Sequence, residues 1–240
     1  MNLLALDTSN RSLTVASASD HHLIAQVSYE NQHSHSVTLM PAIDQVVQQA
    51  GWQPQDLDRI IVAQGPGSYT GLRIGVTTAK MLAWTLHKEL VGVSSLAVLA
   101  QNVGPTKGYL VPLFDARNHN VFAGVYRFNE QEQLETVVED QHLALATLLQ
   151  ELHQIDQPLC FIYDLRADFQ EQIKNSLGTQ VRFIDCYQPQ PESLITLGLQ
   201  AAVITDLNPF VPHYLRQTQA ELIWSQTHSV NSSSNYVEDV

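Results

Sequence analysis

Apolar residues recur along the chain with two different spacings, and together these spacings predict alternating strands and helices. Short apolar or alternating runs in the first hundred residues predict three strands, a helix, a strand, a second helix, another strand and a short helix. We expect these elements, in chain order, at 3–8, 12–18, 22–30, 36–50, 59–65, 72–87, 90–94 and 95–101. The order, which we describe as βββαβα, predicts an α/β fold in which mixed sheets are covered by helices.

The same order of elements begins again about 105 residues further along the chain. Strands are expected at 109–116, 120–129, 133–140, 158–164 and 181–185, and helices at 144–152, after 164 and at 191–205. Asp7 then matches Asp115, and an alternating strand begins six residues after each of them. Chance is the alternative, because an aspartate often ends a strand. A duplication predicts two similar lobes, at 1–104 and 105–225, that face each other across a cleft.

The segment 65–75, GPGSYTGLRIG, lies between an apolar predicted strand and a long apolar predicted helix. Its closely spaced glycines indicate a backbone that needs positive φ or very close approach by another group. A turn that opens a helix also points free N–H groups outward, so one interpretation is an anion or phosphate site. The other interpretation is a tight turn that packs the helix on the strand.

Neither of two familiar nucleotide-binding motifs fits this segment. A Walker A loop needs a lysine and a serine or threonine directly after its last glycine, whereas Gly71 is followed by Leu72 and Arg73. A Rossmann fingerprint needs an acidic residue about 20 positions further on, whereas residues 90–92 are Leu, Val and Gly. The sequence therefore predicts neither of these motifs.

The chain carries 12 basic and 24 acidic side chains, with a formal net charge of −12, so direct nucleic-acid binding by this chain alone is not expected. Cys160 and Cys186 have no metal or redox spacing, which indicates buried thiols in a reducing cytosol. No apolar stretch is long enough to span a membrane, and the first residues lack the basic region of a signal peptide. We therefore expect a cytoplasmic protein with a disordered, Ser- and Asn-rich tail at 226–240.

The predicted two-lobed duplication resembles the actin-like ATPase superfamily, which has a ribonuclease H-like fold. In that superfamily an aspartate at the first β-hairpin handles phosphate or metal, and the turn Asp7-Thr8-Ser9 resembles that hairpin. The counterpart turn after Phe114, DARNHN, has no glycine, and no GG pair lies at 185–205, where the resemblance places an adenosine loop. We therefore do not expect autonomous ATP hydrolysis.

A longer segment, GPGSYTGLRIGVTTAKMLAWTLHKELVGVSSL at 65–96, resembles the signature of the bacterial TsaB (YeaZ) family. The sequence PHYLR at 212–216 resembles the C-terminal motif of the same family, so the resemblance covers the chain from Met1 to about Arg216. The motif residues that it singles out are Asp7, Gly65, Pro66, Gly67, Ser68, Tyr69, Thr70, Gly71, Arg73 and Gly75.

This resemblance implies a role in forming N6-threonylcarbamoyladenosine (t6A) at position 37 of tRNAs that read codons starting with A. It implies that the chain pairs with the catalytic paralogue TsaD in a heterodimer and acts with the ATPase TsaE in a ternary complex. It further implies a homodimer in isolation, contact with tRNA only through the complex, no membrane association, no catalytic residue and no cofactor.

The catalytic paralogue has an HxxxH motif, which places two metal ligands one turn apart on one face of a helix. The corresponding positions here are Ser95 and Leu99, so the resemblance implies that this metal site is absent. His33 and His35 form another close histidine pair. They either grip a metal from an extended segment or make a polar entry to a helix with a flanking serine as N-cap. We favour the polar entry and predict no metal.

The predicted helix from Leu72 to Leu86 is apolar on nearly all sides, which requires burial on all sides. Gly75, Ala79 and Ala83 form a strip of small residues that would let a second helix approach closely. The resemblance implies that this helix and the one at 36–50 pack against the equivalent helices of TsaD. The predicted partner interface consists of Gly75, Thr78, Ala79, Leu82, Ala83, Leu39 and Ile43. The alternative is full burial of the helix inside the monomer.

Two classes of function are therefore open. The first is a non-catalytic scaffold subunit that stabilises and activates TsaD. The second is an autonomous enzyme of the same architecture, either a nucleotide-dependent phosphotransferase or a peptidase-like metalloprotein. The glycine-free second turn, the missing GG pair and the replacement of the histidine ligands by Ser95 and Leu99 favour the scaffold.

Overall fold

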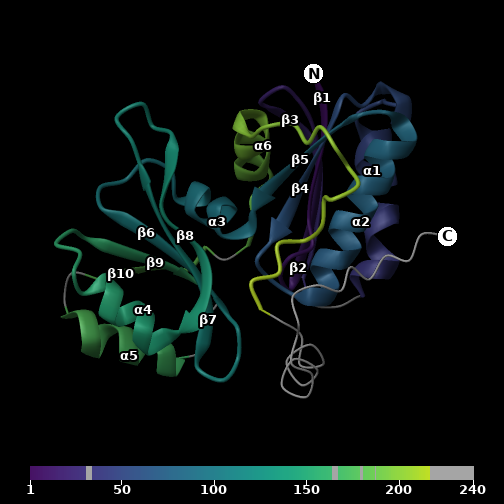
Figure 1. Ribbon diagram of the computed structural model, residues 1–240. Helices are drawn as coiled ribbons and strands as arrows, with labels where there is room; N and C mark the ends of the chain where they lie inside the picture. Colours follow the sequence, from purple (N-terminus) through teal and green to yellow (C-terminus); the bar gives the residue numbers. More distant parts are fainter. Residues whose placement is uncertain (31–33, 164–166, 179–180, 187, 217–240) are drawn as a thin grey trace, which may run out of the picture.

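A computed structural model describes residues 1–30, 34–163, 167–178, 181–186 and 188–216. Its strands form two five-stranded sheets, one from each half of the sequence. The sheets lie side by side as two lobes, the first half in purple and blue and the second in teal and green (Figure 1). His33 and the predicted tail at 226–240 lie outside the described residues.

The first sheet contains β1 (Asn2–Asp7), β2 (Ser12–Ser19), β3 (His22–Glu30), β4 (Arg59–Gly65) and β5 (Glu89–Ser94) in the order β3-β2-β1-β4-β5. The 3₁₀-helix η1 (Pro54–Asp56) precedes β4, and the helices α1 (His35–Gln49) and α2 (Tyr69–Leu86) cover one face of the sheet. Leu4 and Leu6 pack under these two helices, whereas Leu3 and Ala5 pack on the opposite face. β1 therefore buries apolar side chains on both faces of the sheet, as a central strand does.

The second sheet contains β6 (Tyr109–Asp115), β7 (Asn120–Phe128), β8 (Leu134–Ala144), β9 (Leu159–Tyr163) and β10 (Val181–Ile184) in the order β10-β9-β6-β7-β8. The helices α4 (Leu145–Leu152) and α5 (Ala167–Leu177) contribute to the core on one face. As in the first sheet, the first strand pairs antiparallel with the second and parallel with the fourth. The same order and the same strand directions in both sheets confirm the predicted duplication.

Two helices pack across the boundary between the lobes. The helix α3 (Ser95–Val103) follows β5, but its Leu96 and Leu99 pack with residues of β6 and β7. The helix α6 (Pro191–Gln200) comes from the second half of the sequence, but its Leu194 and Ile195 pack on the first sheet. Both helices lie between the two sheets (Figure 1). The division at residue 104 remains a prediction, and these contacts add α6 to the core of the first lobe.

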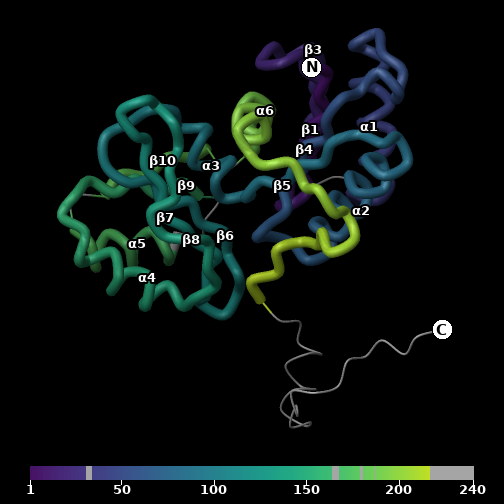
Figure 2. The backbone as a smooth tube through the Cα atoms, turned by 45° about the horizontal axis from the view of Figure 1, so that its top comes forward, coloured from purple at the N-terminus to yellow at the C-terminus, as the bar shows by residue number. Residues whose placement is uncertain are grey.

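The chain after α6 returns over the first lobe as an irregular segment, residues 201–216, which we call the C-terminal strap. It is the yellow-green tube that runs from α6 toward α2 in Figure 2. The amide of Ile204 donates to the carbonyl of Leu90 at 2.9 Å, and that of His213 donates to the carbonyl of Gln64 at 2.7 Å. Lys80 Nζ donates to the carbonyls of Asn208, at 2.9 Å, and Phe210, at 3.1 Å. Most of the strap therefore packs on the first lobe, whereas its last residues, Leu215 and Arg216, contact the second.

Most predicted elements are present, with four main differences. The strand expected at 133–140 continues to Ala144. The helix expected at 72–87 begins at Tyr69, because the Ser68 hydroxyl accepts a hydrogen bond from the Gly71 amide and caps its first turn. The helix expected at 191–205 ends at Gln200. Each half of the chain is βββαβαβα, so it carries one more strand and helix than the βββαβα description. Of the helices in the described part of the chain, none has the length and apolar character that a membrane crossing requires.

Candidate functional site

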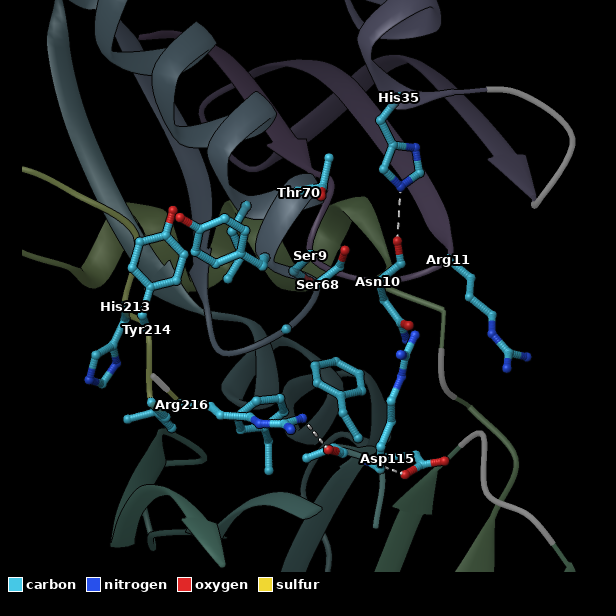
Figure 3. A pocket seen from close by; sticks show the side chains of 18 of the residues that line it. Ser9, Asn10, Arg11, His35, Ser68, Thr70, Asp115, His213, Tyr214 and Arg216 are labelled. Carbon is cyan, nitrogen blue, oxygen red and sulfur yellow. Dashed lines mark hydrogen bonds between the residues drawn. The ribbon is translucent and has the colours of Figure 1, made fainter. Parts of the chain in front are cut away.

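A cleft of about 930 Å³ lies between the two lobes. Its walls come from the β1–β2 turn, the starts of α1 and α2, the β6–β7 turn and the end of the C-terminal strap. Figure 3 shows this cleft, with Ser9 and Asn10 above and Asp115 and Arg216 below. The predicted cleft between two lobes is therefore present, and the GPGSYTG segment contributes to its wall.

Two equivalent turns face each other across the cleft. The Asp7 carboxylate accepts a hydrogen bond from the Ser9 amide at 2.7 Å, and the Asp115 carboxylate accepts one from the Arg117 amide at 2.7 Å. Asp7 and Asp115, which the sequence matches, thus close the same kind of turn in the two lobes. Asp7 is buried, whereas Asp115 is exposed. Burial raises the pKa of Asp7, although the hydrogen bonds from Ser9 oppose the shift.

We expect Asp7→Asn to remove a pH-dependent loss of stability. Because the folded-state pKa of Asp7 is raised, the folded protein holds this proton more firmly than the unfolded chain does. The carboxylate therefore costs stability as the pH rises from below 3.8 through the folded-state pKa. Asparagine keeps an oxygen for the Ser9 amide but cannot ionise. The free energy of unfolding of the variant, measured in urea across this range, should gain on that of the wild type as the pH rises. A constant difference would contradict the assignment.

The glycines of the GPGSYTG segment allow the start of α2 to pack against the Asp7 turn. A Cβ atom at Gly71 would lie 2.1 Å from the carbonyl oxygen of Thr8, and one at Gly67 would lie 2.2 Å from that of Ser9. The Thr8 hydroxyl donates to the Gly71 carbonyl at 2.7 Å, and the Ser68 amide donates to the Ser9 carbonyl at 2.7 Å. These contacts leave no room for side chains, so helix-on-turn packing accounts for both glycines.

The predicted partner residues on the two helices lie mainly inside the first lobe, which corrects the expected interface. Leu39 and Ile43 are buried residues of α1, and Gly75, Ala79 and Ala83 are buried residues of α2. The alternative of full burial applies to them, because the small residues of α2 face the first sheet and the β1–β2 turn that contains Thr8. The partly exposed Thr78 and Leu82 remain predicted interface residues.

The outward faces of the same helices carry other apolar side chains. Trp84 is 63% exposed and Met81 is 47% exposed on α2, and Val37 and Met40 are exposed on α1. Tyr69 begins the outward face of α2 and stacks on Tyr214 of the strap, with 4.8 Å between ring centroids. The sequence analysis missed these residues, because a helix that is apolar on nearly all sides does not reveal which side faces the sheet.

The positions that correspond to the histidine pair of the paralogue lie inside the protein. Ser95 and Leu99 are buried in α3, and Leu99 packs in the core of the second sheet. His35 Nε2 lies 2.9 Å from the carbonyl oxygen of Asn10, which agrees with a polar helix entry. Ser34 occupies the N-cap position of α1, but its side chain makes no capping hydrogen bond. Within the described ranges, no group of three or more His, Cys, Asp and Glu side chains is placed to hold a metal ion.

A second cluster that the sequence analysis missed joins the two lobes. The Ser94 hydroxyl donates to the Asp140 carboxylate at 2.5 Å and caps α3 by accepting from the amides of Leu96 and Ala97. The Tyr126 hydroxyl donates to the other oxygen of Asp140. Burial raises the pKa of Asp140, and burial together with this carboxylate raises the pKa of Tyr126. The cluster therefore links the end of β5 to β7 and β8 through groups separated widely in sequence.

The structure resembles solved structures of the same two-lobed shape. A YeaZ structure from Pseudomonas aeruginosa superposes with a TM-score of 0.71, at 21% identity, over 89% of this chain and 99% of the other. A second structure from Pseudomonas aeruginosa, described as similar to the peptidase YEAZ, superposes with a TM-score of 0.74, at 22% identity, over 90% of this chain and 99% of the other. At these identities the likeness establishes the fold.

The sequence comparisons extend beyond the fold. The family model for TsaD, tRNA N6-adenosine threonylcarbamoyltransferase, matches residues 22–226. The Bacillus subtilis tRNA threonylcarbamoyladenosine biosynthesis protein TsaB is 40% identical over 230 residues, which cover 95% of this chain and 99% of that protein. The TsaB protein of Escherichia coli is 29% identical over 132 residues, covering 54% of this chain and 57% of that protein. The identity to the Bacillus subtilis TsaB protein over nearly the whole chain, together with the shared fold, shows that this protein belongs to the TsaB (YeaZ) family.

Proposed function

We propose that this chain is a non-catalytic scaffold subunit in the formation of t6A at position 37 of tRNA. Its identity to the Bacillus subtilis TsaB protein over 95% of the chain carries the assignment to this modification. In the proposed complex, the chain pairs with the catalytic subunit TsaD and acts with the ATPase TsaE in the cytoplasm. The net charge of −12 supports contact with tRNA mainly through the other subunits.

The chemistry of the described residues supports a non-catalytic role. The two positions that correspond to the metal-binding histidines of the paralogue are the buried Ser95 and Leu99, and leucine has no atom that can bind a metal. Asp7 is buried and holds the backbone of its own turn, so it is not offered to a ligand in the cleft. Asp7, the residue that the superfamily resemblance links to phosphate or metal, therefore stabilises a turn.

The outward faces of α1 and α2 are the proposed docking surface for TsaD. Met81 and Trp84 on α2, with Val37 and Met40 on α1, expose large apolar side chains on two helices that pack together. Exposed apolar side chains of this size are typical of protein interfaces, and tryptophan is enriched among the residues that contribute most to binding. When TsaD is absent, a second copy of this chain occupies the same surface and forms a homodimer.

Reconstitution of tRNA modification tests the scaffold role. Purified TsaD and TsaE from the same organism, with tRNA and threonylcarbamoyl-adenylate, should form little t6A until this chain is added. The chain alone should form none, and isothermal titration with ATP and Mg²⁺ should show no turnover. If the chain alone hydrolyses ATP with micromolar binding, or TsaD is fully active without it, the scaffold assignment is wrong and the autonomous enzyme is favoured.

A further inference from the structure

The cleft between the lobes carries cationic side chains that the proposed function does not use. Arg11, Arg117 and Arg216 line it, and the one carboxylate among its described lining residues is Asp115. This excess of positive charge stands out in a chain with 12 basic and 24 acidic side chains. Field lines concentrate in a cleft with walls of one sign, so the lining attracts anions although the molecule as a whole repels them.

Two of these arginines are held at the same edge of the cleft. Arg117, Asn118 and His119 all have left-handed backbone angles, with φ of 65°, 53° and 59°. This conformation costs free energy in residues other than glycine, so it persists only where the surrounding contacts hold the turn that carries Arg117. The Arg216 guanidinium donates to the carbonyl of Ala116, the residue before Arg117, at 2.8 Å. In Figure 3 the Arg216 side chain extends from the strap toward the turn that contains Asp115.

The donors in the cleft suit a phosphate group better than they suit a metal-bound nucleotide. A guanidinium offers five N–H donors in a planar fork that matches two phosphate oxygens. Magnesium in phosphate sites is held through one or two carboxylates. Here Asp7 is buried, and the Asp115 carboxylate accepts a hydrogen bond from the Arg117 amide. Arginines at these positions can take the neutralising role that a divalent cation has in other phosphate sites.

The size of the cleft limits the ligand to a small molecule. A volume of about 930 Å³ lies in the range of small-molecule sites. The first residues of α2, from Ser68 to Thr70, form part of its wall, and the start of this 18-residue helix favours negative charge. A long nucleic acid would also meet the acidic surface outside the cleft. We propose that the cleft binds a small phosphorylated anion without a divalent metal, held by Arg117 and Arg216.

Isothermal titration of the full chain with sodium pyrophosphate tests the proposal. In EDTA, pyrophosphate should bind with one molecule per chain, and excess Mg²⁺ should weaken the binding, because the metal competes for the same phosphate oxygens. Titration with AMP in EDTA asks whether a nucleoside adds to the affinity. Binding that requires Mg²⁺, or no binding of either anion, would overturn the proposal. Tight binding of tRNA through Arg117 without binding of pyrophosphate would also overturn it.

Substitutions at Arg117 locate the site. Arg117→Gln should weaken pyrophosphate binding roughly tenfold or more, as expected for loss of a charged hydrogen-bonding partner. Arg117→Lys should fall between this variant and the wild type, because it keeps the charge but loses the planar fork. Arg127→Gln is the matched control, since Arg127 lies on β7 in an exposed pair with Glu135 at 3.1 Å and does not line the cleft. Equal affinity in Arg117→Gln and the wild type, with unchanged melting curves, would show an adventitious ion only.

The test is independent of the scaffold role. Pyrophosphate binding is measured on this chain alone, whereas the scaffold role is measured by t6A formation with TsaD. A chain that stimulates TsaD but does not bind pyrophosphate would leave the proposed function intact and remove the anion site. A chain that binds pyrophosphate but does not stimulate TsaD would support the anion site and contradict the scaffold role.

Discussion

Ala79→Arg should leave the chain without a stable fold. Ala79 lies on α2, is 0% exposed and packs in the core that contains Val76 and Leu4. An arginine there must either bury a charge without a partner or push α2 off the sheet, and an unpaired buried charge costs several kcal/mol. A domain is stable by only about 5–15 kcal/mol in total, so one such change removes most of the stability. Circular dichroism and urea denaturation of the purified variant measure the effect.

Thr77→Arg provides the control on the same helix. Thr77 is exposed, so an arginine there can extend into solvent and should leave the unfolding midpoint near that of the wild type. A cooperative transition of Ala79→Arg at the wild-type midpoint would show that α2 does not turn this face to the sheet. The comparison also separates loss of folding from loss of an interface, which a pull-down experiment alone cannot do.

Trp84→Glu should abolish pairing with TsaD and leave the fold intact. The side chain of Trp84 is 63% exposed, so its replacement removes little from the core. Truncation of a central interface tryptophan commonly costs 2 kcal/mol or more, which is roughly a thirtyfold loss of affinity, and a carboxylate adds the cost of its own desolvation. Co-purification with TsaD and titration calorimetry measure the affinity, and thermal melting measures the fold.

Val137→Glu is the matched control for this variant. Val137 is 41% exposed on β8 of the second lobe, away from α1 and α2, so its replacement by glutamate should not affect the pairing. If Trp84→Glu pairs with unchanged affinity while Val137→Glu does not, the docking surface lies on the second lobe. The t6A assay of the two variants should follow their affinities for TsaD.

The sequence predicted the strands well, because their apolar runs are short and are ended by turn residues such as those around Asp7 and Asp115. It also predicted the duplication, since both halves repeat the same order of elements. The direction in which α2 faces could not be predicted, because the helix has both small and large apolar residues on different sides. Packing decides between them: the positions against Thr8 leave room only for glycine, and Val76, Ala79 and Ala83 pack in the core, which leaves Met81 and Trp84 outside.

The cleft was less predictable than the fold. Arg216 and Ala116 are separated by a hundred positions, and only the return of the strap brings them together. The matched aspartates were the available signal, because they place DARNHN opposite Asp7 and so place Arg117 at the cleft. Ser94, Tyr126 and Asp140 carry no local motif, and their cluster follows from the way β5 meets the second sheet.

The packing of α3 and α6 across the boundary between the lobes bears on how the two halves can be separated. A cut after residue 104 would give a first fragment that keeps α3, whose apolar side chains Leu96 and Leu99 need the second sheet. The second fragment would keep α6, whose Leu194 and Ile195 need the first sheet. Each fragment would then expose one face of its sheet and one apolar helix face to water. Although the chain repeats one architectural unit twice, we therefore expect that neither copy folds alone and that the two unfold as a single cooperative unit.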